Sequence, residues 1–193
     1  ATLLLFFLSI TGGAGSTIVV DNTVDPGDDT CGSPGCTLRE AITAANTNPG
    51  SDTITFNISG AGVHTIRPTS PLPSITETVT IDGYTQPGAS ENTRAVGNDA
   101  VLLIELDGSS AGFAVGLSLG CDNSVVRGLV INRFGASGVV LFFGTGNVIE
   151  GSFIGTDATG TADLGNGGTA GVLLNPDNGD LIGGLLPAAR NLI

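Results

Sequence analysis

The tripeptide Ile81-Asp82-Gly83 recurs along the chain as Leu106-Asp107-Gly108, Val126-Arg127-Gly128, Ile149-Glu150-Gly151 and Ile182-Gly183-Gly184. Each copy joins an apolar residue, a variable residue and a glycine, and these glycines lie 25, 20, 23 and 33 residues apart. A second apolar element repeats in phase with the later copies, at residues 115–119, 138–142 and 171–174. A period near 23 residues with corner glycines is typical of stacked structural repeats.

The repeat predicts the fold class. We expect an all-β protein, a single-stranded right-handed parallel β-helix (a solenoid) with a short N-terminal capping α-helix. Each period would add one strand to each of several parallel sheets, and the apolar side chains of Ile81, Val126 and Ile149 would stack inside one core. The 31 glycines and the mean hydropathy of +0.34 agree with a folded, β-rich chain.

One segment carries a helical pattern. Thr37 and Glu40 have the spacing of a capping box, and an apolar stripe follows at Leu38, Ala41, Ile42 and Ala45. The pattern predicts a helix over residues 37–46. We expect this helix to cover the open strand edges of the first repeat.

The chain divides into three parts. Residues 1–16 begin with an apolar run and continue with small residues, which predicts the remnant of a secretory signal peptide; a first β-strand is the alternative. Residues 17–60 form the N-terminal cap, and residues 61–193 form the β-helix coils, which we expect to be truncated at the C-terminus. The predicted location is therefore secreted or cell surface, with no membrane span in the mature chain.

The charge balance excludes some partners. The chain has six arginines, no lysine and a net charge of −12, so it lacks the basic surface that nucleic acids or anionic membranes require. Calcium and neutral glycans are compatible with this charge. The loops at 25–29 and 157–163 carry oxygen ligands suited to calcium, although neither has the spacing of an EF-hand. Solvated turns are the alternative, so we expect no cofactor except calcium at these loops.

Cysteine and histidine are scarce. Cys31 and Cys36 lie close together in a loop rich in glycine, proline and aspartate, and this predicts a disulfide in an oxidising compartment. Cys121 is expected to be a small buried thiol. His64 is the only histidine, which gives little support to a zinc site or a Ser/His/Asp triad, so we expect it at the surface or in a turn.

The residues that precede the repeat glycines are the candidate catalytic residues. If the repeats stack in register, Asp82, Asp107, Arg127 and Glu150 form a column with a spacing of roughly 4.8 Å. Two carboxylates about 5 Å apart match the geometry of retaining glycosidases, and an acidic pair beside an arginine also suits a calcium-dependent lyase. The alternative is an outward column in which opposite charges compensate across strands. A second column, Ser124, Asn147 and Asp180, is expected to bond backbone between repeats.

The segment Cys36-Thr37-Leu38-Arg39-Glu40-Ala41-Ile42, followed by Ala44-Ala45-Asn46, resembles the N-terminal motif of CSLREA-domain bacterial exported proteins, with threonine in place of the typical serine. Segments that commonly accompany this motif are similar to residues 81–88, 153–160, 182–184 and 188–191. The resemblance covers residues 17–193. It implies a pectin-lyase-like right-handed β-helix in a large exported protein, and it carries no catalytic residues over.

Three functions follow as hypotheses. The first is a structural or adhesion scaffold that binds glycans or another surface protein through displayed loops, chiefly residues 155–168. The second is a polysaccharide lyase or glycoside hydrolase acting at an acidic groove. The third is an extracellular fibre subunit that self-associates end to end. The small number of catalytic candidates favours the scaffold over the enzyme.

Overall fold

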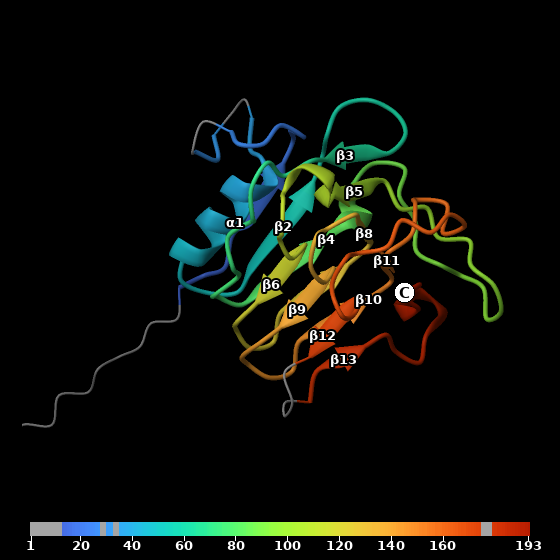
Figure 1. The fold of residues 1–193 in the computed structure, drawn as a ribbon. Helices are drawn as coiled ribbons and strands as arrows, with labels where there is room; N and C mark the ends of the chain where they lie inside the picture. The colour runs from blue at the N-terminus through green and yellow to red at the C-terminus, as the bar shows by residue number, and fades with distance from the viewer. Residues whose placement is uncertain (1–12, 28–29, 33–34, 175–178) are drawn as a thin grey trace, which may run out of the picture.

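The computed structural model describes residues 13–27, 30–32, 35–174 and 179–193. Within them, thirteen strands form three parallel sheets, and one α-helix packs beside the first strands (Figure 1). The predicted signal segment lies mostly in residues 1–12, outside the described residues. None of the described helices has the length and apolar character needed to cross a membrane.

The largest sheet has six strands, and its members come from the whole length of the chain. Their order across the sheet is β1 (Thr17–Val20), β2 (Asp52–Phe56), β4 (Val79–Asp82), β7 (Val125–Arg127), β10 (Val148–Glu150) and β13 (Leu181–Ile182). Four fully buried residues are consecutive partners in the parallel register of this sheet: Ile54, Ile81, Val126 and Ile149. Their side chains form the central row of the core.

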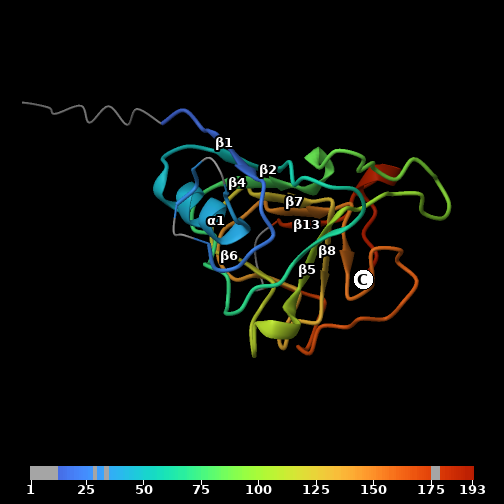
Figure 2. The same cartoon turned by 90° about the horizontal axis from the view of Figure 1, so that it is seen from above.

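The other two sheets take the strands between these. The four-stranded sheet has the order β11 (Phe153–Ile154), β8 (Leu129–Asn132), β5 (Ile104–Asp107) and β3 (His64–Ile66). The three-stranded sheet has the order β12 (Val172–Leu174), β9 (Val139–Leu141) and β6 (Leu117–Leu119). In Figure 2 the strands of the six-stranded sheet overlap one another in the upper part of the molecule, and β5 and β8 of the four-stranded sheet run downward from there. The main core lies between the inner faces of the sheets.

The helix α1 spans Leu38–Thr47, which confirms the helix predicted for residues 37–46. Thr37 is the N-cap, and both bonds of the capping box with Glu40 are present. Leu38, Ala41, Ile42 and Ala45 are buried and belong to the main core, because the stripe faces the sheet. In Figure 1 the helix lies beside β2, at the end of the molecule where the six-stranded sheet begins.

The predicted single-stranded right-handed parallel β-helix is wrong, and so are its descriptions as a solenoid and as pectin-lyase-like. The described residues form three separate parallel sheets of unequal size with one α-helix, which is closer to an α/β-type fold. The period is also not constant. Val79 is bonded to Ser124, 45 residues away, whereas Ser124 is bonded to Asn147 after 23 residues and Asn147 to Asp180 after 33.

The step of 45 residues has a simple physical reason. Between β4 and β7 the chain contributes β5 to the four-stranded sheet and β6 to the three-stranded sheet. The tripeptide Leu106-Asp107-Gly108 therefore ends a strand of a different sheet, and it is not a neighbour of Ile81-Asp82-Gly83. The spacing of 25 residues therefore suggested that Asp82 and Asp107 are neighbours, although the strands that they end do not pair.

A small second core covers the outer face of the four-stranded sheet. Val130 and Phe153 are buried there against Leu102, with Ala158 and Leu192 packed beside them. Two long loops supply part of this cover: residues 86–103, called the 86–103 loop, and residues 155–168, called the 155–168 loop. The segment predicted to be a displayed polar insertion is thus partly folded back onto the sheet.

Candidate functional site

Asp82 has a structural role at the end of β4. Its Oδ1 accepts a hydrogen bond from the Tyr84 backbone N–H at 3.0 Å and caps a 3₁₀ turn over Gly83–Thr85. Its Oδ2 accepts one from Arg127 Nη2 at 2.7 Å. Both oxygens are therefore occupied, and Asp82 faces an arginine in the neighbouring strand.

Asp107 has the same local role in another sheet. It caps the 3₁₀ turn over Gly108–Ser110 by accepting from the Ser109 N–H, and its Oδ2 accepts from Arg67 Nε at 3.0 Å and Arg133 Nη1 at 3.3 Å. Burial alone would raise the pKa of Asp107, but the bonds from Ser109 and the charges of Arg133 and Arg67 outweigh it and the pKa is lowered. A lowered pKa makes this carboxylate a poor general acid.

The predicted catalytic column is not formed. Arg127 lies between Asp82 and Glu150 in the parallel register, so Asp82, Arg127 and Glu150 are consecutive, and Asp107 is paired instead with Asn132. The hydrogen bond to Asp82 raises the pKa of Arg127 despite its partial burial, so it remains a cation. The structure thus separates the two carboxylates expected about 5 Å apart and shows opposite charges compensating across strands.

The position of Tyr84 explains why a glycine, Gly128, follows β7. Its hydroxyl donates to the Gly151 carbonyl at 2.6 Å, and burial raises its pKa. Gly128 has a φ of +71°, and a Cβ on it would meet the Tyr84 backbone nitrogen at 2.8 Å. The glycine at this corner is therefore required by conformation and by the close approach of Tyr84.

The second predicted column is confirmed as a structural ladder. Ser124 Oγ accepts from the Val79 N–H at 2.9 Å, Asn147 Oδ1 accepts from the Ser124 N–H at 2.9 Å, and Asp180 Oδ1 accepts from the Asn147 N–H at 2.8 Å. Each short side chain thus accepts a hydrogen bond from a backbone N–H at the start of the preceding strand in the six-stranded sheet.

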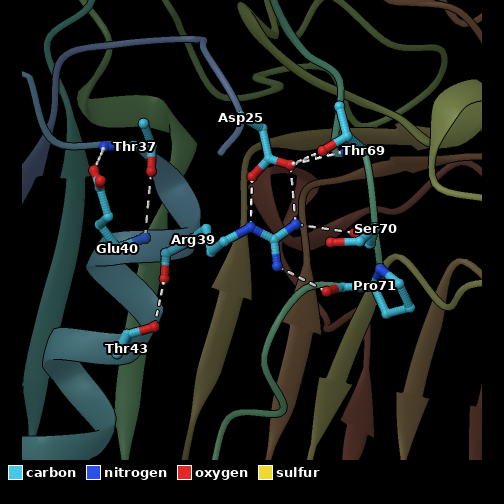
Figure 3. Close-up of polar contacts among 8 residues, drawn as sticks. All are labelled: Asp25, Thr37, Arg39, Glu40, Thr43, Thr69, Ser70 and Pro71. Atoms are coloured by element: carbon cyan, nitrogen blue, oxygen red, sulfur yellow. Dashed lines mark hydrogen bonds and ion pairs between the residues drawn. The ribbon is translucent and has the colours of Figure 1, made fainter. Parts of the chain in front are cut away.

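Arg39, in the first turn of α1, connects the helix to two other segments, and we call its contacts and those of Asp25 the clamp. Arg39 donates from Nε and Nη2 to the two carboxylate oxygens of Asp25, at 2.7 and 2.9 Å, and from Nη1 and Nη2 to the carbonyls of Pro71 and Ser70 (Figure 3). Thr69 adds two bonds to Asp25 Oδ2. Burial alone would raise the pKa of Asp25, but the bonds from Arg39 and Thr69 outweigh it and the pKa is lowered. The clamp joins the N-terminal loop, the helix and the segment before β4.

The cysteines and the histidine have defined places. Cys31 and Cys36 form a disulfide directly before the N-cap residue Thr37. Cys121 is a free, buried thiol as predicted, and burial raises its pKa. His64 was predicted at the surface or in a turn, which is wrong: it lies in β3 and is only 9% exposed.

The part of the chain that the structure describes contains no group of three or more His, Cys, Asp or Glu side chains placed to hold a metal ion. Asp157, the first residue of one candidate calcium loop, is occupied by its own loop: its carboxylate accepts from the Thr159 hydroxyl and from the N–H groups of Thr161 and Ala162. In the other candidate calcium loop, residues 25–29, Asp25 forms an ion pair with Arg39, and residues 28–29 lie outside the described residues.

A groove lies between the two long loops. Residues 95–98 and 159–161 form its sides, Phe153, Arg190 and Leu192 complete the lining, and its volume is about 560 Å³. We call it the Arg190 groove. A second cavity of about 490 Å³ shares Ala95 and Arg190 with it. In Figures 1 and 2 the C-terminal segment lies between the green 86–103 loop and the orange 155–168 loop.

Arg190 differs from the other five arginines, all of which lie in the described part of the chain. Each of these five has a carboxylate within 4.0 Å; they are Arg39, Arg67, Arg94, Arg127 and Arg133. Among the described residues, no carboxylate lies that close to Arg190, which instead donates to carbonyls of the 86–103 loop. Sequence reasoning missed this residue because nothing local distinguishes it from the paired arginines.

No protein-family model, no curated protein and no solved structure matches this chain. The similarity of residues 36–46 to the CSLREA motif therefore stays a prediction. The clamp and the capping box give those residues a structural account that does not depend on a family.

Proposed function

We propose that the chain is a non-catalytic binding module of an exported protein, and that it holds its ligand in the Arg190 groove. The observation that carries the proposal is the groove itself. It is concave, it combines apolar side chains with a cation and two threonines, and loops of two different connections form it. Few convergent polar groups in a largely apolar concavity are the usual composition of a binding site.

Both loops are fixed by their own hydrogen bonds, which supports a preformed site. In the 86–103 loop, Asn92 Oδ1 accepts from the Arg94 and Asp99 N–H groups, and Ser90 and Val101 form an antiparallel bridge. In the 155–168 loop, Asp157 organises the turn, and Thr156 bridges to Asp163. A preformed groove binds without the entropic cost of ordering a loop.

The carboxylates of the chain favour binding over catalysis. Asp82 and Asp107 are capped, paired with arginines and located on different sheets. Glycoside hydrolysis typically uses two such groups facing one substrate bond. No observation among the described residues favours the hydrolase or lyase alternative.

The Cys31–Cys36 disulfide supports an exported location, because disulfides persist in oxidising compartments. Glycans and surface proteins are the partners we propose, since the net charge of −12 disfavours nucleic acid. Calcium is not part of the proposal. The oxygens of Asp25 and Asp157 already accept donors from the protein.

The test is ligand binding with a filled groove. Binding to a glycan array is compared for the unchanged chain, for Thr161→Trp, which places an indole in the groove, and for Thr76→Trp, at an exposed position outside its lining. We expect Thr161→Trp to weaken binding at least about tenfold and Thr76→Trp to leave it unchanged. Equal binding by both variants, or cleavage products from a bound glycan, would contradict the proposal.

A further inference from the structure

Arg39 shows how an arginine with a carboxylate partner is held in this protein. The edge formed by Nε–H and one Nη2–H binds both oxygens of Asp25 (Figure 3). The remaining bonds run from Nη1 to the Pro71 carbonyl at 2.8 Å and from Nη2 to the Ser70 carbonyl at 3.0 Å. The pattern is two-point contact with a carboxylate on one edge and carbonyls on the other side of the guanidinium.

Arg190 has the carbonyl half of the same pattern. Its Nη1 donates to the carbonyls of Arg94, at 3.3 Å, and Gly97, and its Nη2 donates to the Ala95 carbonyl at 2.7 Å. A guanidinium has five N–H donors. Among the described residues, these three bonds leave Nε–H and one Nη2–H without an acceptor. Arg39 uses the same two kinds of donor for Asp25.

The surroundings of this edge suit a ligand. Arg190 is half-buried, and it lines both the Arg190 groove and the adjoining cavity. A partly desolvated cation gains most from a bidentate carboxylate, because its remaining hydration is already reduced. Val96 and Leu192 line the same groove and offer apolar contact beside the charge, with the buried Phe153 beneath them.

We propose that Arg190 is a carboxylate receptor: its Nε–H and free Nη2–H bind the carboxylate of a ligand, and the ligand's apolar part lies against Val96 and Leu192. The inference rests on the proposed function and names the ligand class of that groove. The net charge of −12 disfavours polyanions, and Arg190 offers one edge beside apolar side chains, so the proposed ligand carries a single carboxylate next to an apolar group.

The experiment compares N-acetylphenylalanine with N-acetylphenylalanine amide, which differ only in the carboxylate. Each is titrated into the ¹⁵N-labelled chain, and the Nε–H resonances of the arginines are followed by NMR. We expect the acid to shift the Arg190 Nε–H resonance and to bind about tenfold more tightly than the amide. The Arg39 Nε–H resonance should not move, because Asp25 already occupies it.

A matched pair of variants locates the effect. Arg190→Lys retains a cation but loses the bidentate edge, so the acid should bind no better than the amide. Arg67→Lys changes an arginine that bonds Asp107 outside the groove, and it should keep the preference for the acid. If Arg190→Lys disturbs the 86–103 loop, the comparison of acid and amide on the unchanged chain still decides.

The outcomes separate this inference from the proposed function. Equal affinity for acid and amide, with shifts at groove residues, overturns the carboxylate receptor and leaves the groove as a binding site. No shift of the Arg190 Nε–H resonance with the acid up to about 10 mM also overturns the receptor. The binding function is then judged by the array experiment, which uses other ligands and the Thr161→Trp variant.

Discussion

Asp25 is 2% exposed in its side chain and accepts four hydrogen bonds, two from Arg39 and two from Thr69. Because the carboxylate is paired from both sides, its ionised form is stabilised in the folded protein. The residue is thus a link between three segments rather than a calcium ligand, and its contribution can be measured directly.

We expect Asp25→Asn to lower the free energy of unfolding by about 3 kcal/mol, because Arg39 loses its counterion inside the protein. Denaturant unfolding measures this change. Glu77→Gln, at an exposed carboxylate, is the control and should have little effect. An Asp25→Asn variant as stable as the unchanged chain would contradict the clamp.

The pH dependence of stability has a defined sign. The folded pKa of Asp25 and Asp107 is lowered, so their stabilisation is present above the unfolded pKa of about 3.9 and is lost as the pH falls through the folded pKa. We expect stability to fall on acidification below about pH 4.5 and to fall less in Asp25→Asn. Thermal unfolding in a pH series measures both curves, and parallel curves would refute the assignment.

Gly128 and Gly112 allow a matched test of the Tyr84 corner. Their φ angles are +71° and +69°, but a Cβ on Gly128 meets Tyr84 whereas a Cβ on Gly112 has no atom within 4 Å. Replacement by alanine should cost about 1 kcal/mol at Gly112, from backbone strain alone, and about 2 kcal/mol more at Gly128. Equal losses in chemical denaturation would show that Tyr84 is not a close neighbour.

At the scale of the element, the helix was predictable because its signals are local. The capping box and the apolar stripe lie within ten residues of each other, and the structure places both as expected. The sheets were less predictable, because the partner of a strand lies 22 to 45 residues away. Asp82 and Asp107 illustrate the limit: both cap a 3₁₀ turn at a strand end, and this shared local chemistry hides that they belong to different sheets.

The N-cap provides the prediction for the element. Thr37→Ala should lower the free energy of unfolding by about 1 kcal/mol, because the Glu40 N–H loses its side-chain acceptor. Thr43→Ala, on the exposed face of the same helix, should change it by less than about 0.5 kcal/mol. A larger loss at Thr43 than at Thr37 would contradict the capping assignment.

At the scale of the whole molecule, most of the arginines serve as partners of carboxylates. Five of the six arginines, all in the described part of the chain, hold carboxylates in place, and the sixth lines the Arg190 groove. The location of Arg190 could not be derived from sequence, because its neighbours come from residues 94–97, more than ninety positions earlier. Only the folded chain distinguishes it.

Metal independence is a prediction for the whole molecule. Since the carboxylates of Asp25 and Asp157 are occupied by protein donors, we expect 1 mM calcium or a chelator to change the melting temperature by less than about 1 °C. Differential scanning calorimetry tests this expectation. A calcium-dependent rise of several degrees would show that a metal site was missed.

Strand β4 pairs with β7 and not with β5, which separates Asp82 from Asp107. Disulfide trapping tests it most directly in a Cys121→Ser background. Thr80→Cys is combined with Val125→Cys, its register partner, or with Glu105→Cys. Trypsin cleaves after Arg94, so a cross-link joins the same two peptides in either pair and is read by mass spectrometry. We predict a cross-link for Thr80→Cys with Val125→Cys and none with Glu105→Cys; the reverse result would contradict the account.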